Sequence, residues 1–304
     1  MKASILRAAV GMAALLGASG MTAAPLQSPT PPAARLMALA FPGWRDDEAG
    51  RLQTATLPHL AGGVHGGHAG WHEGANRVLA LPGPVLRIDA THLILIAGLV
   101  PAAPDGSRAA VPQLTPMALA ARRFERRGDV WRTSGSQDVF ALRGFAGSAR
   151  LRAAALSRRH QGVAVEYGSC FDGYCGTWLA LYELDKDTVR HEPVVELALG
   201  GDNLEGGADC ARRLQPLRKP QALAVAARGS DAALDEHDCY AIESSWSIDT
   251  GRAQPGDLTI RYQGTMSRAD EHTAAPVAID QQQVLRYESG RYRAVSGFNP
   301  VPPI

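Results

Sequence analysis

The chain has 304 residues, of which 45% are hydrophobic and 20% are charged, and this balance excludes wholesale disorder. Its 32 Gly and 20 Pro residues are too few for a low-complexity chain. Residues 1–24 hold two of the 31 basic residues and none of the 30 acidic ones. The remainder is therefore close to neutral and gives no electrostatic basis for binding nucleic acid.

The first residues, Met1–Ala24, have the pattern of a secretory signal peptide. Lys2 and Arg7 precede the apolar run Ala8–Leu16, and small residues follow it, as in segments that are cleaved after export. The run is shorter than the about 18 residues that a membrane span needs. No Cys lies near the expected cleavage site. We therefore expect an exported protein, periplasmic or secreted, without a membrane span or a lipid anchor.

The next part of the chain is expected to contain little regular structure. Residues 25–34 are rich in proline and predict an extended spacer. Residues 35–83 predict an irregular segment with a His- and Gly-rich loop at Ala61–Gly74. One short helix is predicted at Ala33–Ala40.

Residues 84–298 predict a β-rich domain, because short apolar runs follow one another between turn residues. Asp257–Gln263 alternates apolar and polar residues, as a half-buried antiparallel strand does. The strands predicted in this domain are Val85–Ala90, His92–Val100, Met117–Phe124, Val130–Thr133, Val139–Leu142, Ala149–Ser157, Gly162–Tyr167, Thr177–Leu184, Val189–Leu199, Tyr240–Ile248, Asp257–Gln263, Gln282–Tyr287 and Arg291–Val295.

Three segments share one pattern, an aromatic residue and Glu followed by a charged or glycine-containing turn. They begin at Phe124, Tyr182 and Tyr287, and in the last of them Ser289 and Gly290 predict a two-residue hairpin turn. Recurrent hairpins favour an all-β, antiparallel fold that resembles a β-propeller with few blades. A β-sandwich is the alternative.

The four cysteines predict disulfides, since their number is even and the chain is expected to be exported. Cys170 and Cys175 flank a segment that contains Asp-Gly, a strong signal for a tight turn, which leaves Cys210 and Cys239 to pair with each other. A zinc site of four thiolates is the alternative, but the spacing lacks the paired C-x2-C that such sites use.

The predicted binding residues lie in the turn between Cys170 and Cys175 and just after it. Phe171, Tyr174 and Trp178 surround this disulfide, and a stapled loop with aromatic residues is a preordered anchor for a protein partner. The alternative is that one or both loop aromatics fold back over the disulfide.

A metal site is considered at His65, His68 and His72, because imidazoles in a flexible loop can gather around Zn or Cu. Solvent-exposed histidines are the alternative interpretation. Carboxylates are clustered in other loops, and a pair of them could serve a hydrolase, so this activity is kept as an alternative function. Motifs for a serine nucleophile, a phosphate loop or a dinucleotide site are absent from the sequence, so no catalytic residue is predicted.

The C-terminal third resembles exported, β-rich proteobacterial proteins of unassigned activity. The resemblance covers about residues 237–297 and includes Cys239 before a strand, Gly256-Asp257-Leu258, Gly264-Thr265, and the hairpin with Tyr287, Gly290 and Tyr292. Some of these proteins are periplasmic immunity proteins, so the resemblance implies binding to a secreted antibacterial toxin.

These observations favour an exported protein-binding protein, most concretely an immunity or inhibitor protein that neutralises a secreted effector. A periplasmic hydrolase that uses loop carboxylates or a His-bound metal is the first alternative. A metal-handling envelope protein is the second.

Overall fold

The computed structural model describes residues 30–47, 50–57, 71, 74–103, 105–108, 115–145, 149–206, 210–214, 238–267 and 276–303. The predicted signal peptide and residues 25–29 of the Pro-rich spacer lie outside these ranges. All the elements described below belong to one unit, Pro31–Ile304. No helix among these residues is long and apolar enough to cross a membrane.

Antiparallel strands dominate the described residues, which confirms the prediction of an all-β protein. One sheet has five strands in the order β1-β2-β3-β4-β5. They are β1 (Leu52–Leu57), β2 (Gly74–Arg87), β3 (His92–Pro101), β4 (Met117–Arg127) and β5 (Val130–Arg143).

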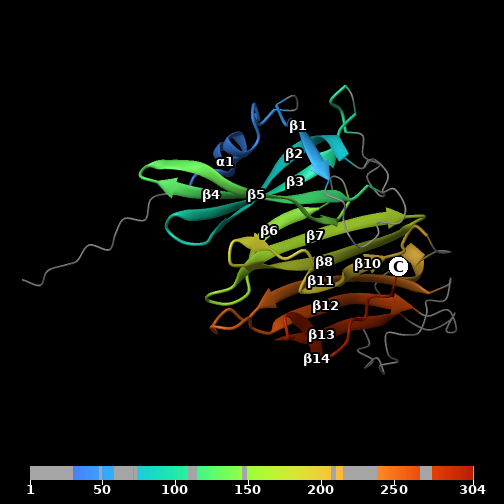
Figure 1. The fold of residues 1–304 in the computed structure, drawn as a ribbon. Coiled ribbons are helices and arrows are strands. Elements are labelled where there is room, and N and C mark those ends of the chain that lie inside the picture. The colour runs from blue at the N-terminus through green and yellow to red at the C-terminus, as the bar shows by residue number, and fades with distance from the viewer. Residues whose placement is uncertain are drawn as a thin grey trace, which may run out of the picture. The chain divides into compact units, whose positions relative to one another are not determined.

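The other sheet has nine strands, of which eight follow the order β14-β13-β12-β11-β10-β8-β7-β6 while β9 pairs with β8. Figure 1 shows these strands side by side in chain order, from yellow-green to red. They are β6 (Arg150–Ala155), β7 (Gln161–Phe171), β8 (Tyr174–Asp185), β9 (Thr188–Val189), β10 (Val195–Asp202), β11 (Cys239–Ile248), β12 (Leu258–Ser267), β13 (Val277–Glu288) and β14 (Arg291–Ser296).

The propeller form of the prediction is corrected by this topology. A propeller repeats four-stranded blades, whereas these strands form meanders of five and eight strands. The predicted hairpins exist, but successive hairpins continue the same sheet instead of starting a new blade. The arrangement is closer to the sandwich alternative, because the two sheets share one hydrophobic cluster.

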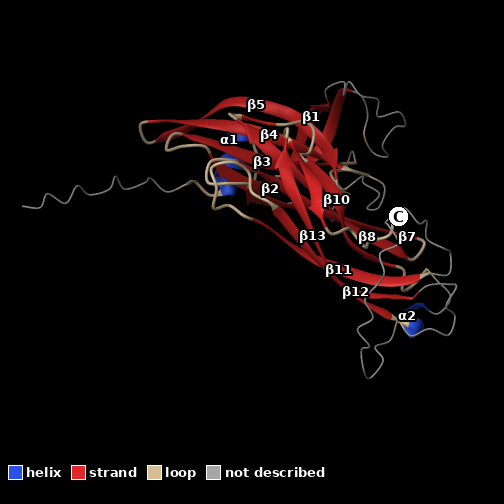
Figure 2. Ribbon diagram, turned by 90° about the horizontal axis from the view of Figure 1, so that it is seen from below, coloured by secondary structure: helices blue, strands red, loops and turns tan. Residues whose placement is uncertain are grey.

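Two short helices accompany the sheets, α1 (Ala33–Ala40) and α2 (Cys210–Arg213), as Figure 2 shows in blue. The predicted helix at Ala33–Ala40 is confirmed. Its fully buried Leu36 and Met37 pack on the five-stranded sheet. Two buried tryptophans also attach to this sheet. The indole N–H of Trp44 donates to the carbonyl of Ala80 at 2.9 Å, and that of Trp71 donates to the carbonyl of Pro116 at 2.8 Å.

The central strand of the five-stranded sheet, β3, is buried on both faces. Along β3, Leu93, Leu95, Ala97 and Leu99 join the cluster under α1, while alternate residues join the cluster between the sheets. A strand that is buried on both faces has a continuous apolar sequence, and this is what His92–Pro101 shows.

The nine-stranded sheet curls into a half-barrel. Its concave face collects apolar residues from β6 through β14 into one cluster. The backbone N–H of Gly256, before β12, donates to the carbonyl of Leu156, after β6, at 2.9 Å. The C-terminal segment packs on the same face through the buried Val301, and Asn299 donates to the carbonyl of Ala198 at 2.8 Å.

The prediction of an irregular segment over residues 35–83 is wrong where β1 and the first part of β2 lie. Pro82, Gly83 and Pro84 interrupt the sequence of β2 and indicate a loop. In the structure, the register between β2 and β3 shifts between Pro82 and Val85. Proline is tolerated in sheets at such irregularities, so the strand continues through them.

Two further strand boundaries differ from the prediction. The separate strands Val130–Thr133 and Val139–Leu142 form one strand, β5, which continues through a polar stretch at the edge of its sheet. Val189–Leu199 is divided into β9 and β10, because Pro193 between them has no N–H for strand pairing.

The side chain of Gln137 on β5 links the two sheets. Its amide N–H donates to the carbonyl of Val189 at 2.8 Å, and its amide oxygen accepts from the N–H of Val189 at 3.1 Å. One side chain thus imitates strand pairing between β5 and β9.

The turn between β2 and β3 contains a carboxylate whose pKa is strongly lowered. Asp89 accepts hydrogen bonds from the backbone N–H groups of Thr91 and His92 at 2.6 and 2.8 Å. The bond from Thr91 is the main cause that lowers the pKa of Asp89 to about 2. The ionised form therefore stabilises the folded turn.

We expect the substitution Asp89→Ala to lower the urea midpoint at pH 7, because it removes these hydrogen bonds. A depressed folded-state pKa contributes stability above the unfolded pKa of about 3.9, and this stability is lost as the pH falls toward 2. The two proteins should therefore have different midpoints at pH 7 and converge at pH 2. A difference that stays constant over this range would contradict the assignment.

Candidate functional site

The hairpin between β7 and β8 ends in the predicted tight turn. Asp172 and Gly173 occupy its two central positions with φ values of 50° and 80°, and Phe171 pairs with Tyr174 across the strands. A two-residue turn with positive φ at both positions matches the twist of the flanking strands, and Asp-Gly suits it. Glycine is also required at position 173 because a Cβ there would lie 2.3 Å from the backbone nitrogen of Gly206.

Both predicted disulfides are present. Cys170 and Cys175 are directly opposite in the register of β7 and β8 and are bonded to each other. Cys210 and Cys239 form the second disulfide, which joins α2 to the start of β11. The alternative of a zinc site with four thiolates is thereby excluded, since no cysteine is free. The two disulfides indicate an oxidising compartment, as in exported proteins.

A second loop lies directly against the hairpin turn. Gly206 leaves room for the turn, because a Cβ on it would approach the carbonyl oxygen of Asp172 to 2.8 Å. The buried Asn203 fixes this loop to the start of β11. Its amide donates to the carbonyl of Asp238 at 2.6 Å, and its amide oxygen accepts from the N–H of Tyr240 at 2.9 Å.

We call residues 171–174 and 203–206 together the rim. Two of the five exposed large hydrophobic side chains among the described residues lie on it, Phe171 with 75% and Leu204 with 36% of its surface exposed. Apolar side chains on backbone that is already fixed lose little conformational entropy when a partner covers them. The rim is therefore a preformed apolar contact surface.

The three predicted binding residues have different environments. Phe171 is exposed, as a binding anchor must be. Tyr174 is half-buried, and its ring lies beside Gly206 in the second loop. The indole of Trp178 is stacked on the ring of Tyr167, with centroids 5.6 Å apart. Of the three, Phe171 alone projects freely.

Tyr167 is in turn fixed by its own polar contacts. Its hydroxyl donates to Glu196 at 2.7 Å. Burial and this bond to a carboxylate raise the pKa of Tyr167 well above its ordinary value. The phenol thus stays protonated as a donor, and it holds the stacked pair in place below the hairpin tip.

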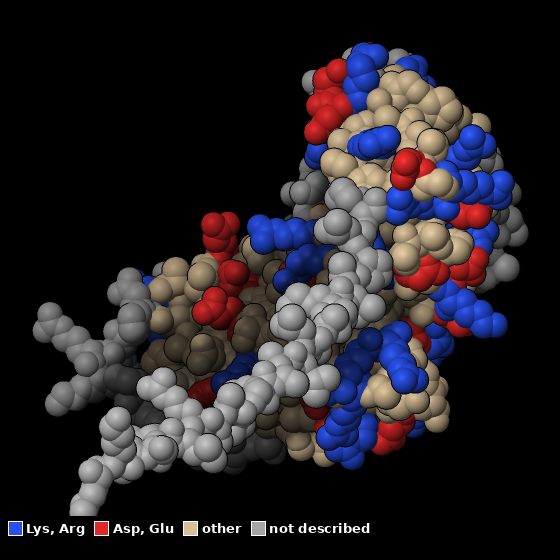
Figure 3. All heavy atoms as spheres, turned by 90° about the vertical axis from the view of Figure 1, so that its left-hand side faces the viewer, with Lys and Arg blue, Asp and Glu red and all other residues tan. Residues whose placement is uncertain are grey.

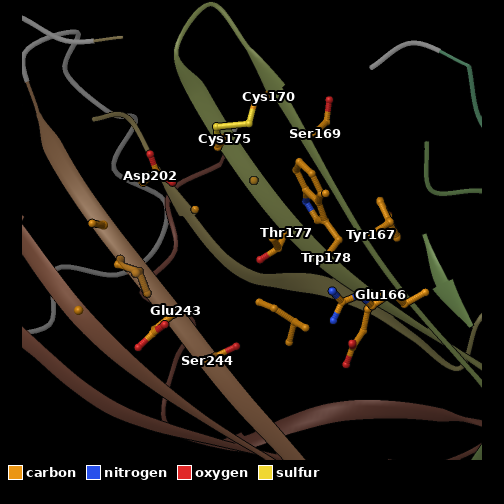
Figure 4. Close-up of a pocket in the computed structure, with 18 of the residues that line it drawn as sticks. Glu166, Tyr167, Ser169, Cys170, Cys175, Thr177, Trp178, Asp202, Glu243 and Ser244 are labelled. Carbon is orange, nitrogen blue, oxygen red and sulfur yellow. A yellow bond between two sulfur atoms is a disulfide. The ribbon is translucent and has the colours of Figure 1, made fainter. Parts of the chain in front are cut away.

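A cavity of about 1260 Å³ adjoins the stapled hairpin (Figure 4). Its wall is formed by β6, β7, β8, β10 and β11, together with both cysteines of the first disulfide. Among its polar lining residues are Arg150, Arg152, Glu166, Thr177 and Ser244. The cavity and the rim lie at the same end of β7 and β8, where the hairpin turn is.

Three lining side chains form a polar cluster that crosses the concave face. Trp246 on β11 donates its indole N–H to Oε1 of Glu166 on β7 at 2.7 Å, although β8 and β10 separate these strands in the sheet. Arg152 on β6 pairs with the same carboxylate oxygen and lies over the indole ring, 5.1 Å from its centroid. The curl of the half-barrel brings these residues together.

The candidate metal ligands His65, His68 and His72 lie outside the described residues, so the prediction of a Zn or Cu site stays a prediction. Where the chain is described, no group of three or more His, Cys, Asp or Glu side chains is arranged to hold a metal ion.

Charged side chains of both signs are interspersed on the face that Figure 3 presents. The hairpin of β4 and β5 illustrates this mixture, with an ion pair between Arg126 and Asp129 at 3.0 Å and another between Arg127 and Glu125 at 3.0 Å. Near-equal numbers of basic and acidic residues predict such a surface.

Several site residues were missed by sequence reasoning. Leu204 is a lone apolar residue in a loop of Gly, Asp, Asn and Glu, and that contrast is a usable signal. Glu166 and Trp246 are 80 residues apart in the chain, and no local pattern links them. No protein family, curated protein or solved structure matches this chain.

Proposed function

We propose that this chain is an exported binding protein that holds a protein partner through the rim. The observation that carries the proposal is the exposed Phe171 on a turn that is closed by a disulfide and supported by a second loop. Binding hot spots are enriched in aromatic residues at preordered positions. Leu204 on the supporting loop extends the apolar surface.

A second exposed hairpin provides the comparison that makes the rim distinctive. Val130 follows the Gly128-Asp129 turn between β4 and β5 and is 53% exposed. No disulfide closes that turn, and the residues next to Val130 form two ion pairs. A single apolar residue in charged surroundings is ordinary protein surface, whereas the rim combines two apolar residues on fixed backbone.

The concrete form of the proposal is an immunity or inhibitor protein in the periplasm, with a secreted antibacterial effector as partner. Its support is the resemblance of residues 237–297 to exported, β-rich proteins of unassigned activity, some of which are immunity proteins, together with two disulfides that suit an oxidising compartment. On this proposal, the rim covers a functional surface of the effector.

The experiment is affinity capture by the mature chain from residue 25, using envelope extract supplemented with the products of neighbouring genes. The wild-type protein, Phe171→Ser and Val130→Ser are compared in parallel. We expect one stoichiometric partner that survives high salt, is retained by wild type and Val130→Ser, and is lost from Phe171→Ser. Equal retention by all three proteins would contradict the role of the rim, and retention of no partner would contradict the proposed function.

The immunity form is tested in cells. Deletion of the gene should sensitise a strain to a sister strain that delivers the captured effector, and the wild-type gene should restore resistance. Unchanged survival of the deletion strain would contradict the immunity role while leaving the binding measurement intact.

A further inference from the structure

The nine-stranded sheet ends at β6, and the outer edge of this strand has no partner strand among the described residues. β6 pairs with β7 on one side and is the last strand in the order of its sheet. The N–H of Leu156 donates to the carbonyl of His160 across this hairpin at 2.9 Å. Backbone groups alternate in direction along a strand of an antiparallel pair. The N–H and C=O groups of Arg152 therefore point to β7, and those of Leu151 and Ala153 point away from the sheet.

Two other terminal strands are covered at their edges, whereas β6 is open. On β14, the N–H of Tyr292 donates to the carbonyl of Val194 at 2.8 Å, and on β5 the side chain of Gln137 pairs with the backbone of Val189. Prolines and bulges commonly prevent pairing at natural sheet edges. β6 contains no proline, and its register with β7 has no bulge. Ala153 is small and exposed, so the edge is sterically accessible where its backbone groups point outward.

The chemistry of a free strand edge selects an extended peptide segment. Its unpaired N–H and C=O groups are satisfied by a strand whose own backbone groups alternate in the same way. The main-chain bonds supply affinity, and pockets for alternate side chains of the added strand supply selectivity. The cavity provides such a pocket, because Arg150 and Arg152 of β6 line it. Every second side chain of an added strand would therefore face the cavity.

The charges on the cavity side of β6 decide which strand fits. Arg150 and Arg152 are both exposed. Arg152 pairs with Glu166, whereas Arg150 forms no ion pair with a described residue. The cavity as a whole has as many acidic as basic lining residues, but its other carboxylates, Asp202 and Glu243, belong to β10 and β11, three and four strands away from β6 in the sheet. An added strand lies directly beside β6, so its side chains are next to the arginines.

Pairing with a second copy of β6 is disfavoured by the same arginines. Two antiparallel copies of this strand would bring Arg150 and Arg152 of both chains onto one face of the joined sheet. Like charges on facing strand positions destabilise pairing, and opposite charges stabilise it. The edge therefore disfavours its own copy and favours a strand with acidic residues on the cavity side.

We infer that the free edge of β6 binds an extended, acidic peptide segment as an added strand. The source of this segment rests on the proposed function, which supplies a protein partner. The rim and β6 border the same cavity, since Leu204 and Arg150 both line it. β7 pairs with β6 through Gln161–Glu166 and continues to Phe171 on the rim. One partner can thus cover Phe171 with its folded surface and pair with β6 through an extended segment.

Peptide selection on the mature protein tests the edge without the partner. A phage-displayed library of linear peptides is selected against the wild type, and the enriched peptides are synthesised and titrated by calorimetry. We expect peptides with acidic residues at alternate positions, bound at least about tenfold more weakly by Arg150→Glu and by Ala153→Pro. Ala153→Pro removes an outward N–H and no bond to β7, and proline is tolerated at such edge positions.

Each of these variants has a matched control that should bind like the wild type. Ala153→Ser changes the same side chain and keeps the N–H. Arg132→Glu reverses the charge of an exposed arginine on the other sheet. Phe171→Ser alters the rim and leaves the edge of β6 unchanged.

Amide hydrogen exchange shows whether the peptide pairs with the strand. In the free protein, the amides of Leu151 and Ala153 should exchange rapidly, while those of Arg152 and Ala154 should be protected by β7. A saturating peptide should slow exchange at Leu151 and Ala153 at least about tenfold. Arg152 and Ala154 are the internal controls and should not change.

Four results would overturn the inference: no enriched peptide, enriched peptides without acidic residues, equal binding by Ala153→Pro and the wild type, or unchanged exchange at Leu151 and Ala153. Urea unfolding shows whether Ala153→Pro is folded, and Arg150→Glu supplies a second variant at an exposed position. Peptide pairing at the edge together with capture of no partner would contradict the proposed function alone. Capture of a partner, with no peptide pairing at the edge, would contradict the edge alone.

Discussion

The substitution Phe171→Ala should weaken binding of the captured partner at least about thirtyfold, because truncation of a hot-spot residue costs 2 kcal/mol or more. The folded protein should be unaffected, since three quarters of this side chain is already in solvent. Calorimetric titration of the partner gives the dissociation constants, and urea unfolding gives the stability of each variant.

Val130→Ala is the matched control for this measurement, because it truncates an exposed apolar side chain beside another two-residue turn. Its affinity for the partner should equal that of the wild type. Similar losses for both variants would show that general surface hydrophobicity, rather than the rim, holds the partner.

Removing the two disulfides should have different consequences. Paired substitution of Cys210 and Cys239 by Ala opens a loop with a sequence separation of 29 residues. On the loop-entropy model this lowers the free energy of unfolding by about 3 to 4 kcal/mol. Both cysteines are also fully buried in a small hydrophobic cluster, so the substitution leaves unfilled space.

Paired substitution of Cys170 and Cys175 by Ala opens a loop with a separation of only 5 residues, which corresponds to about 2 kcal/mol on the same model. Its larger effect should be on partner binding, because Phe171 would then be presented by a less ordered tip. Urea unfolding without reductant and titration of the partner separate the two effects. A larger loss of stability from the hairpin disulfide than from the long-range one would contradict this assignment.

The parts of the fold that the sequence predicted are those with local causes. Asp172-Gly173 and Ser289-Gly290 have the residue types that two-residue turns require, and the pairing of Tyr287 with Tyr292 followed from the second of them. The alternation of Leu258, Ile260 and Tyr262 toward one cluster is likewise local. The disulfide pairing followed from the position of one such turn.

The parts that sequence reasoning missed depend on contacts between distant segments. The division into two meander sheets is decided by which hairpins pack on which, and no turn motif encodes it. Leu204 joins the rim only because Gly173 and Gly206 let two loops touch. The cavity depends on the curl that brings Trp246 to Glu166.

The most direct test of the rim as the partner-binding surface is photocrosslinking from single positions. A photoreactive phenylalanine analogue is placed at Phe171 or at Val130 in the mature protein, which is then irradiated in envelope extract. We expect a crosslink to one partner from position 171 and none to that partner from position 130. Crosslinks of equal yield from both positions, or a crosslink to the partner from position 130 alone, would contradict this expectation.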